Sequence, residues 1–137
     1  MSNIKRVVFL SGPMRGVPRK EGIEWREKAR NLLKSNFEIL HALRGREEKE
    51  TFPDPRLAVI RDKDDIDRSN VVLVNDTFKN VSMIGTSMEV LLAYQLNKTV
   101  IIFGKEHEND YWLSYHSHVR VETLEEACDL ANRMFSK

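Results

Sequence analysis

Three short runs of apolar, mostly β-branched residues constrain the fold of this chain more than any other feature. They are VVFL at 7–10, VVLV at 71–74 and VIIF at 100–103. Each run is continuous rather than alternating, which is typical of strands buried on both faces of a parallel sheet. FEIL at 37–40 is a further strand candidate, and HVRVE at 118–122 is a weaker one.

Residues at helical spacing fill much of the chain between these runs. They are Trp25, Ala29, Leu32 and Leu33 before the second strand, and Leu124, Ala127, Cys128, Ala131 and Met134 near the C-terminus. The alternation of strand and helix predicts an α/β fold with right-handed crossovers. The polar stretch 41–56 interrupts this order with two prolines, and a functional loop and a mobile loop are equally good interpretations of it.

The chain has 137 residues, which suits one domain spanning 1–137. Its 22 lysines and arginines nearly balance 21 acids, and no basic stripe with interleaved aromatics is present. We therefore expect no nucleic-acid partner. No signal-peptide pattern or membrane-length apolar run occurs, so we expect no membrane partner. One cysteine, Cys128, excludes an internal disulfide and favours the cytoplasm.

In an open parallel sheet, ligands bind beyond the carboxyl ends of the strands, where the strand order reverses. Three segments are expected to meet there: SGPMRG at 11–16, NDTF at 75–78 and GTSME at 85–89. In the first segment, glycines allow close approach to a ligand and Arg15 suits a phosphate or carboxylate. The segment matches neither a dinucleotide-binding fingerprint nor a P-loop. A simple turn carrying a solvated arginine is an equally good interpretation.

Glu89 is the first acidic candidate, and two interpretations of it compete. Thr86-Ser87-Met88-Glu89 matches the capping box, in which a Thr caps a helix and the Glu reaches back. A carboxylate in the first helical turn would also be held ionised by the helix dipole. An ionised carboxylate at the ligand end of the sheet is what a nucleophile requires.

Asp62 is the second acidic candidate. If RLAVIRDKDDIDRSN is a helix, Val59, Asp62 and Ile66 share one face, and Asp62 points inward. Asp65 could also reach inward, whereas Asp64 and Asp67 should face solvent. A shift of the helix by one or two residues would turn Asp62 outward.

Other polar residues give less specific signals. Asn75 and Asp76 follow the second run and suit either a ligand contact or an Asx turn. His116 and His118 form an H-x-H pair, but no further ligand pattern supports a metal site, so we expect neither a metal nor a cofactor.

Together these segments resemble the nucleoside 2-deoxyribosyltransferase superfamily, which includes the 2'-deoxynucleoside 5'-monophosphate N-hydrolases. The motifs that carry the resemblance are GPM-R-G after the first strand, an Asp-bearing helix before S-N-VVLV, then S-x-I-G-T-x-M-E and a strand after N-K-T-V. The likeness covers residues 6 to 104. It implies a flavodoxin-like or Rossmann-like three-layer sandwich with a five-stranded, mostly parallel sheet, and a homo-oligomer, most simply a dimer.

The resemblance also implies roles for individual residues. The family's catalytic glutamate falls on Glu89, and the acid that assists the departing base falls on Asp62. Arg15 matches the arginine that monophosphate hydrolases are thought to use for the 5'-phosphate. The candidate substrate-binding residues are Ser11, Gly12, Pro13, Met14, Arg15, Gly16, Asp65, Asn75, Ser82, Gly85, Thr86 and Met88.

Three activities fit this pattern. The leading one is hydrolysis of the N-glycosidic bond of a (deoxy)nucleoside 5'-monophosphate; the others are deoxyribosyl transfer between bases, and nucleotide binding without turnover. The chain departs from the hydrolase pattern at Pro13, where a small polar residue is usual. It also has Phe9 where an aromatic hydroxyl often stands near the glutamate, and the Ser82–Glu89 spacing is one residue longer.

Overall fold

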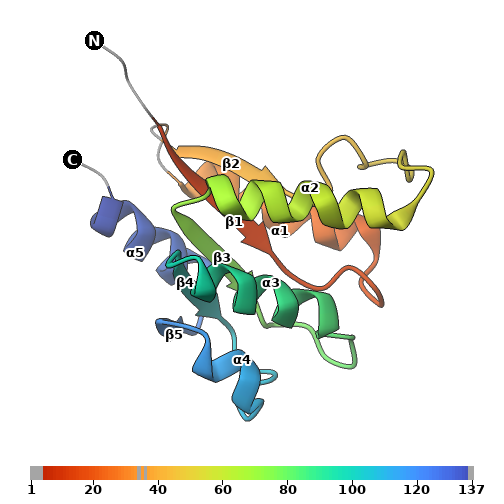
Figure 1. The fold of residues 1–137 in the computed structure, drawn as a ribbon. Helices are drawn as coiled ribbons and strands as arrows, with labels where there is room; N and C mark the ends of the chain where they lie inside the picture. The colour runs from red at the N-terminus through yellow and green to blue at the C-terminus, as the bar shows by residue number, and fades with distance from the viewer. Residues whose placement is uncertain (1–4, 34, 36, 136–137) are drawn as a thin grey trace.

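A computed structural model describes residues 5–33, 35 and 37–135. Strands and helices alternate along this part of the chain (Figure 1). The strands are β1 (Arg6–Ser11), β2 (Phe37–His41), β3 (Val71–Asn75), β4 (Thr99–Phe103) and β5 (Val119–Val121). The helices are α1 (Arg19–Leu32), α2 (Pro55–Arg68), α3 (Ile84–Gln95), α4 (Tyr111–Tyr115) and α5 (Leu124–Phe135). All five predicted strands are thus confirmed, as is the predicted alternation.

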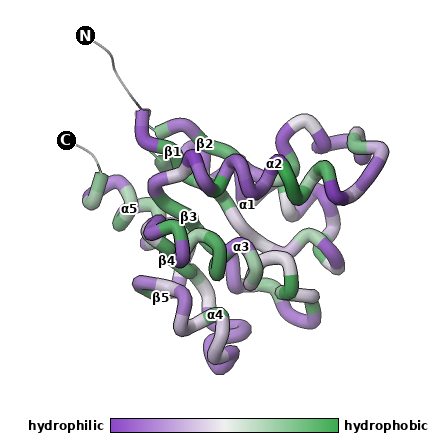
Figure 2. The backbone as a smooth tube through the Cα atoms, viewed as in Figure 1, coloured by the Kyte–Doolittle hydropathy of each residue, from purple (hydrophilic) through white to green (hydrophobic). Residues whose placement is uncertain are grey.

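The strands form one parallel sheet in the order β2-β1-β3-β4-β5. The central strands β3 and β4 are buried almost throughout, as continuous apolar runs predict (Figure 2). The chain moves outward from β1 to β2 and then returns past β1 to β3, so the order reverses between β1 and β3. This arrangement, flavodoxin-like in its strand order, places the predicted ligand site beyond the ends of those two strands.

Helices cover both faces of the sheet, which makes three layers (Figure 1). On one face, α1 and α5 pack through Trp25, Ala29, Ala127 and Ala131 against one core cluster. On the other face, α2, α3 and α4 contribute to a second cluster that includes Ile66 and Leu113. None of the helices among the described residues has the length and apolar character needed to cross a membrane.

The helical faces predicted from spacing are largely confirmed. Cys128 is buried in the core, as expected, and burial raises the pKa of its thiol to about 12. Met134, at the end of the same apolar stripe, is instead half exposed.

The predicted face of α2 is correct at Asp62 and Ile66 and wrong at Val59. Ile66 is fully buried, whereas the side chain of Val59 is 56% exposed. Leu57 and Ile60, in the same part of α2, are exposed as well. Asp64 and Asp67 are exposed, as predicted.

Candidate active site

The two acidic candidates converge at the β1/β3 end of the sheet. Ser11 is the last residue of β1 and is buried. Its hydroxyl donates a hydrogen bond to Glu89 Oε1 at 2.6 Å. Glu89 therefore lies directly over the carboxyl end of β1, and Ser11 supplies a hydroxyl contact that Phe9 does not.

Asp62 of α2 and Glu89 of α3 lie close enough for each carboxyl group to act on the pKa of the other. Burial raises the pKa of Glu89, and the neighbouring Asp62 raises it further, while Ser11 and Arg26 act in the opposite direction. Burial likewise raises the pKa of Asp62, opposed chiefly by Arg61. Asp62 Oδ1 is buried and accepts no hydrogen bond from a described donor. Two carboxyl groups that act on each other in this way titrate as a pair.

The structure corrects the capping-box interpretation of Glu89. Helix α3 begins at Ile84 with Met83 as its N-cap residue, so Thr86 lies inside the first turn, where it is buried. Glu89 belongs to the second turn and bonds to Ser11 instead of reaching back to a cap. Glu89 therefore does not lie in the first helical turn, where the dipole was expected to favour its ionised form, and burial together with Asp62 raises its pKa.

The loop after β1 packs closely against α1. A Cβ atom on Gly12 would lie 2.9 Å from Trp25 Cζ2, so only glycine fits there without displacing the indole. Gly16 has a φ of +86°, a conformation that glycine adopts at least cost. The two glycines fix a narrow turn between them.

A cavity of about 450 Å³ lies against this loop. Pro13, Met14, Arg15, Arg19 and Leu43 are among its lining residues. Arg15 itself is exposed. The loop thus presents an exposed cation beside a cavity, and neither Asp62 nor Glu89 lines that cavity.

Arg26 is the site residue that sequence reasoning missed. Its side chain is 1% exposed and stacks on Trp25, with Cζ 4.5 Å from the ring centroid. Nη1 donates to the Gly22 carbonyl at 2.9 Å and Nη2 to the Gly12 carbonyl at 3.3 Å. Burial lowers its pKa to about 10, with Glu89 and Asp62 opposing that shift.

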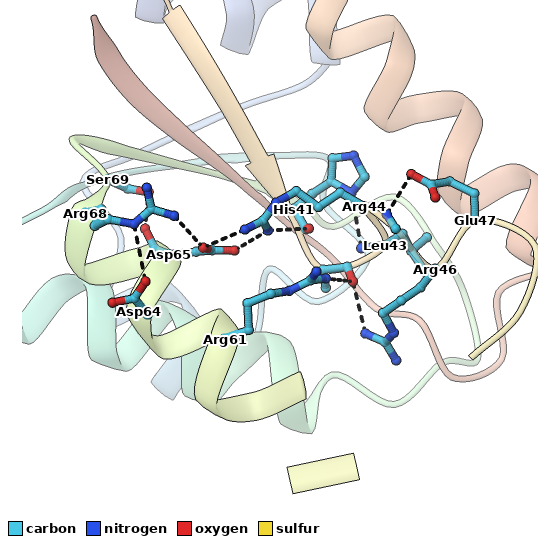
Figure 3. A network of polar contacts seen from close by, with 12 residues as sticks. His41, Leu43, Arg44, Arg46, Glu47, Arg61, Asp64, Asp65, Arg68 and Ser69 are labelled. Atoms are coloured by element: carbon cyan, nitrogen blue, oxygen red, sulfur yellow. Dashed lines mark hydrogen bonds and ion pairs between the residues drawn. The ribbon is translucent and has the colours of Figure 1, made fainter. Parts of the chain in front are cut away.

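Asp65 lies one turn from Asp62 but has different partners (Figure 3). Its buried carboxylate accepts hydrogen bonds from Arg44 at 2.5 and 3.0 Å and from Arg68 at 3.0 Å. Both of its oxygens are therefore engaged by arginines. This places the candidate substrate contact Asp65 in an ion-pair network between α2 and the segment after β2.

The segment 42–52 is held to α2 by further arginines. Arg46 and Arg61 both donate to the Ala42 carbonyl, at 3.0 and 2.8 Å. Both guanidinium groups also lie over the Phe52 ring, 5.4 and 5.1 Å from its centroid. Of the two interpretations of the 41–56 stretch, a functional loop and a mobile loop, these contacts disfavour the mobile loop.

The remaining candidates occupy the end of β3 and the start of α3. Asn75 accepts hydrogen bonds from the amide and hydroxyl of Thr77, at 2.9 and 2.6 Å, which is the Asx turn considered from the sequence. Ser82, Gly85 and Met88 are exposed. Met88 and Ser87 line a second cavity of about 550 Å³ between α3 and α4.

The other polar candidates are used within the fold. Asp76 is buried and bonds to His107 and Arg120, which ties the end of β3 to the region after β4. His118 Nδ1 accepts from the Val100 amide at 3.0 Å, and His116 Nδ1 lies 2.7 Å from the Trp112 carbonyl oxygen. Within the described residues, no three His, Cys, Asp or Glu side chains gather as a metal site would require.

Comparison with known proteins adds a fold relationship. No family model and no curated protein sequence matches the chain. Among solved structures, a conserved protein from Enterococcus faecalis superposes with a TM-score of 0.71 at 12% identity, covering 96% of this chain and 99% of that one.

Two further structural neighbours have described activities. A 2-deoxyribosyltransferase from Bacillus psychrosaccharolyticus has a TM-score of 0.68 at 15% identity, with 90% of each chain covered. A CMP N-glycosidase from Clostridium botulinum has a TM-score of 0.62 at 18% identity, covering 95% of this chain and all of that one. These similarities confirm the predicted flavodoxin-like α/β fold over nearly the whole chain.

Proposed function

We propose that this protein belongs to the nucleoside 2-deoxyribosyltransferase superfamily and cleaves the N-glycosidic bond of a (deoxy)nucleoside 5'-monophosphate. The observation that carries the proposal is the meeting of Asp62 and Glu89 at the β1/β3 switch point, with Ser11 bonded to Glu89. Two carboxyl groups flanking an anomeric carbon suit an oxocarbenium-like transition state. The fold shared with a deoxyribosyltransferase and a CMP N-glycosidase adds support.

In the first step, the Glu89 carboxylate attacks C1' of the sugar and forms a covalent ester. The bond from C1' to the base breaks, and the base takes the proton that Asp62 holds. A carboxyl pair that shares one proton supplies both the nucleophile and the acid. The Ser11 hydroxyl orients Glu89 for attack.

In the second step, Asp62, now ionised, takes a proton from water. The hydroxide oxygen bonds to C1', and the ester to Glu89 breaks. The products are the free base and the sugar phosphate, and both carboxyl groups return to their starting state.

The phosphate group of the substrate is assigned to Arg15. Its exposed guanidinium, beside the cavity at 13–19 and the glycine turn, suits a dianionic oxygen cluster. A free nucleoside would not need this cation. Ser82 and Ser87, at the start of α3, are the further candidates for phosphate contacts.

The second candidate function is deoxyribosyl transfer, which is favoured by the similarity to the Bacillus enzyme. It shares the first step. A second base, rather than water, then attacks C1' and gives a new nucleoside.

We also propose that the protein is a homodimer. Large hydrophobic side chains on α2, α3 and α4 are exposed, among them Ile60 at 63%, Ile84 at 69% and Trp112 at 71%. Ile84 and Trp112 border the 550 Å³ cavity near the start of α3. Large exposed apolar side chains of this kind suit burial against a second copy. Light scattering after size-exclusion chromatography is expected to give twice the 16.0 kDa chain mass, and Ile84→Glu is expected to give a monomer.

Chromatography of nucleoside monophosphates and free nucleosides, incubated with and without an acceptor base, tests the activity. Free base released from the monophosphates alone is expected. A new nucleoside in the acceptor samples would favour transfer, and no reaction of any substrate would favour a binding protein. Glu89→Gln, folded but inactive, is the matched control for contaminating activity.

A further inference from the structure

The cavity beside the β1–α1 loop has a positively charged wall without an acid in it. Its charged lining residues are Arg15 and Arg19, and the others are proline, glycine or apolar residues. The two prolines, Pro13 and Pro18, have no amide proton to donate. Recognition of a polar ligand in this cavity of about 450 Å³ therefore falls chiefly on two guanidinium groups.

Neither arginine is neutralised by an ion pair with a described residue. Arg15 is exposed and makes no side-chain hydrogen bond within the described part of the chain. Arg19 is half-buried, and its side chain makes one hydrogen bond to a described residue, from Nη1 to the Arg46 carbonyl at 2.5 Å. Two cations that face one cavity without a counter-charge attract an anion.

The acids on the neighbouring segments do not supply that counter-charge. Glu47 accepts a hydrogen bond from the Gly45 amide at 3.1 Å, and Glu50 pairs with Arg46. Glu21, in the first turn of α1, is exposed. None of these three carboxylates lines the cavity. The positive charge of its wall thus remains available to a ligand.

The carbonyl that holds Arg19 belongs to a well-anchored residue on the segment after β2 (Figure 3). Arg46 is 7% exposed, and its amide donates to the Leu43 carbonyl at 2.8 Å. Its side chain donates to the Ala42 carbonyl at 3.0 Å and pairs with Glu50. A guanidinium that a fixed acceptor already holds loses less conformational freedom when it binds a ligand. The segment after β2 therefore positions Arg19 before a ligand arrives.

The cavity is framed by two segments that are far apart in the sequence. Leu43, from the segment after β2, is 2% exposed and lines the cavity. It packs closely on α1, because a Cβ atom on Gly22 would lie 3.3 Å from Leu43 Cδ1. The turn that carries Arg15 is closed by a hydrogen bond from the Val17 amide to the Met14 carbonyl at 3.2 Å. Each of the two segments thus places one arginine at the cavity.

We propose that Arg19 is a second phosphate-binding residue beside Arg15, and that the segment 42–52 positions it through the Arg46 carbonyl. The inference deepens the proposed function and rests on it for the identity of the anion, the 5'-phosphate of the substrate. Two guanidinium groups engage more phosphate oxygens than one, so they favour a dianionic phosphate over a free nucleoside. The polar 41–56 stretch thereby acquires a function in substrate selection.

Titration calorimetry with inorganic phosphate, at constant ionic strength, tests the inference without turnover. Arg19→Gln removes the charge and keeps an amide donor for the Arg46 carbonyl. It is expected to weaken phosphate binding about 10- to 100-fold, as Arg15→Ala is, because each change removes a charge-assisted hydrogen bond. Arg19→Lys, which keeps the charge, is expected to restore most of the affinity. An unchanged affinity in Arg19→Gln would overturn the inference.

The matched control is Lys20→Gln, which removes the next cation along α1. The Lys20 side chain is 89% exposed and does not line the cavity. Because solvent and salt screen an exposed charge, the phosphate affinity is expected to stay within about twofold of the wild type. A loss as large as that of Arg19→Gln would show a response to net charge and overturn the inference. Failure of phosphate to bind the wild type would also overturn it.

Glu50→Gln tests the positioning by the segment 42–52 through the sign of its effect. Removal of a negative charge would by itself strengthen the binding of an anion. Loss of the ion pair with Arg46 is instead expected to loosen the carbonyl that holds Arg19 and to weaken phosphate binding about 2- to 5-fold. Equal or tighter phosphate binding in this variant would overturn the positioning role of the segment.

The outcomes separate this inference from the proposed function. If phosphate and nucleoside monophosphates bind with the expected dependence on Arg19 while no nucleotide releases its base, the phosphate site stands and the proposed activity fails. If monophosphates release their base but Arg19→Gln changes neither phosphate affinity nor KM, the activity stands and the inference fails. An equal loss of kcat/KM for a monophosphate and its free nucleoside in Arg19→Gln would assign Arg19 a structural role and also overturn the inference.

Discussion

Asp62 and Asp65 lie one turn apart on the same helix, yet their surroundings differ in kind. Asp65 is fully buried, and arginines bind both of its oxygens. Asp62 has a buried oxygen without a donor and faces another carboxyl group. A satisfied buried acid stabilises the fold, whereas an unsatisfied one stores unfavourable free energy that a ligand or a reaction can use. The difference separates Asp65, which acts in the fold, from Asp62, which we propose acts in catalysis.

Of the changes considered, replacement of Glu89, the carboxyl group that Asp62 faces, is expected to have the largest effect, and that effect is on activity. Glu89→Gln removes the nucleophile, so base release from the best substrate should fall by at least about 10³-fold, as for the loss of other covalent catalysts. Circular dichroism should show an unchanged fold, since Gln retains an acceptor for Ser11. Turnover at the wild-type rate in this variant would rule out the covalent mechanism.

Replacement of the two aspartates is expected to separate stability from activity. Asp65→Asn leaves Arg44 and Arg68 without their carboxylate and should lower the free energy of unfolding by about 3 kcal/mol. Asp62→Asn should change it by less than about 1 kcal/mol, because it removes a group with no donor. Urea unfolding of both variants measures this. Equal losses of stability would end the distinction between the two acids.

Removal of the Arg15 cation is expected to act on phosphorylated substrates alone. Arg15→Ala should raise KM for the monophosphate about 10- to 100-fold, the usual range for one charge-assisted hydrogen bond. Activity on a free nucleoside should stay unchanged. Lys20→Ala, another exposed cation near the start of α1, is the control. Parallel losses for both substrates would assign the phosphate elsewhere.

The pH dependence of stability is expected to show the smallest effect. The folded-state pKa values of Asp62 and Glu89 lie above their unfolded values. At pH values between the two, the native protein therefore holds more protons than the unfolded chain. Their contribution to stability is therefore complete below about pH 4 and is lost as pH rises through the folded values. Relative to Glu89→Gln, the free energy of unfolding of the wild type should fall by on the order of 1 to 2 kcal/mol between pH 5 and pH 9. A pH-independent difference would contradict the raised pKa values.

The sheet could be predicted because its signal is local. A strand buried on both faces must be apolar along its length, and VVLV and VIIF satisfy that condition without reference to other residues. Asp62 was placed correctly because it lies four residues before the buried Ile66. Val59 was not, since the outward face of α2 is also apolar and periodicity alone does not say which apolar face meets the sheet.

The details of the site depend on contacts between distant segments. The Thr86–Glu89 spacing fits a capping box, but the same spacing occurs inside any helix, and the contact with Ser11 spans 78 positions. Arg26 lies in the polar stretch REKAR and has the appearance of a solvent-facing residue in the sequence. Its one local signal is Gly22, four residues earlier, which leaves room for the guanidinium on the same side of α1.

The packing of Trp25 beneath Gly12 gives the site an optical reporter. Of the two tryptophans in the chain, Trp25 is 8% exposed and contacts the edge of Phe103, whereas Trp112 is 71% exposed. Trp112→Phe would leave a single emitter between the Arg26 charge and the glycine turn. Because indole emission responds to nearby charge and polarity, its wavelength and intensity would report ligand entry and ionisation of the pair in real time.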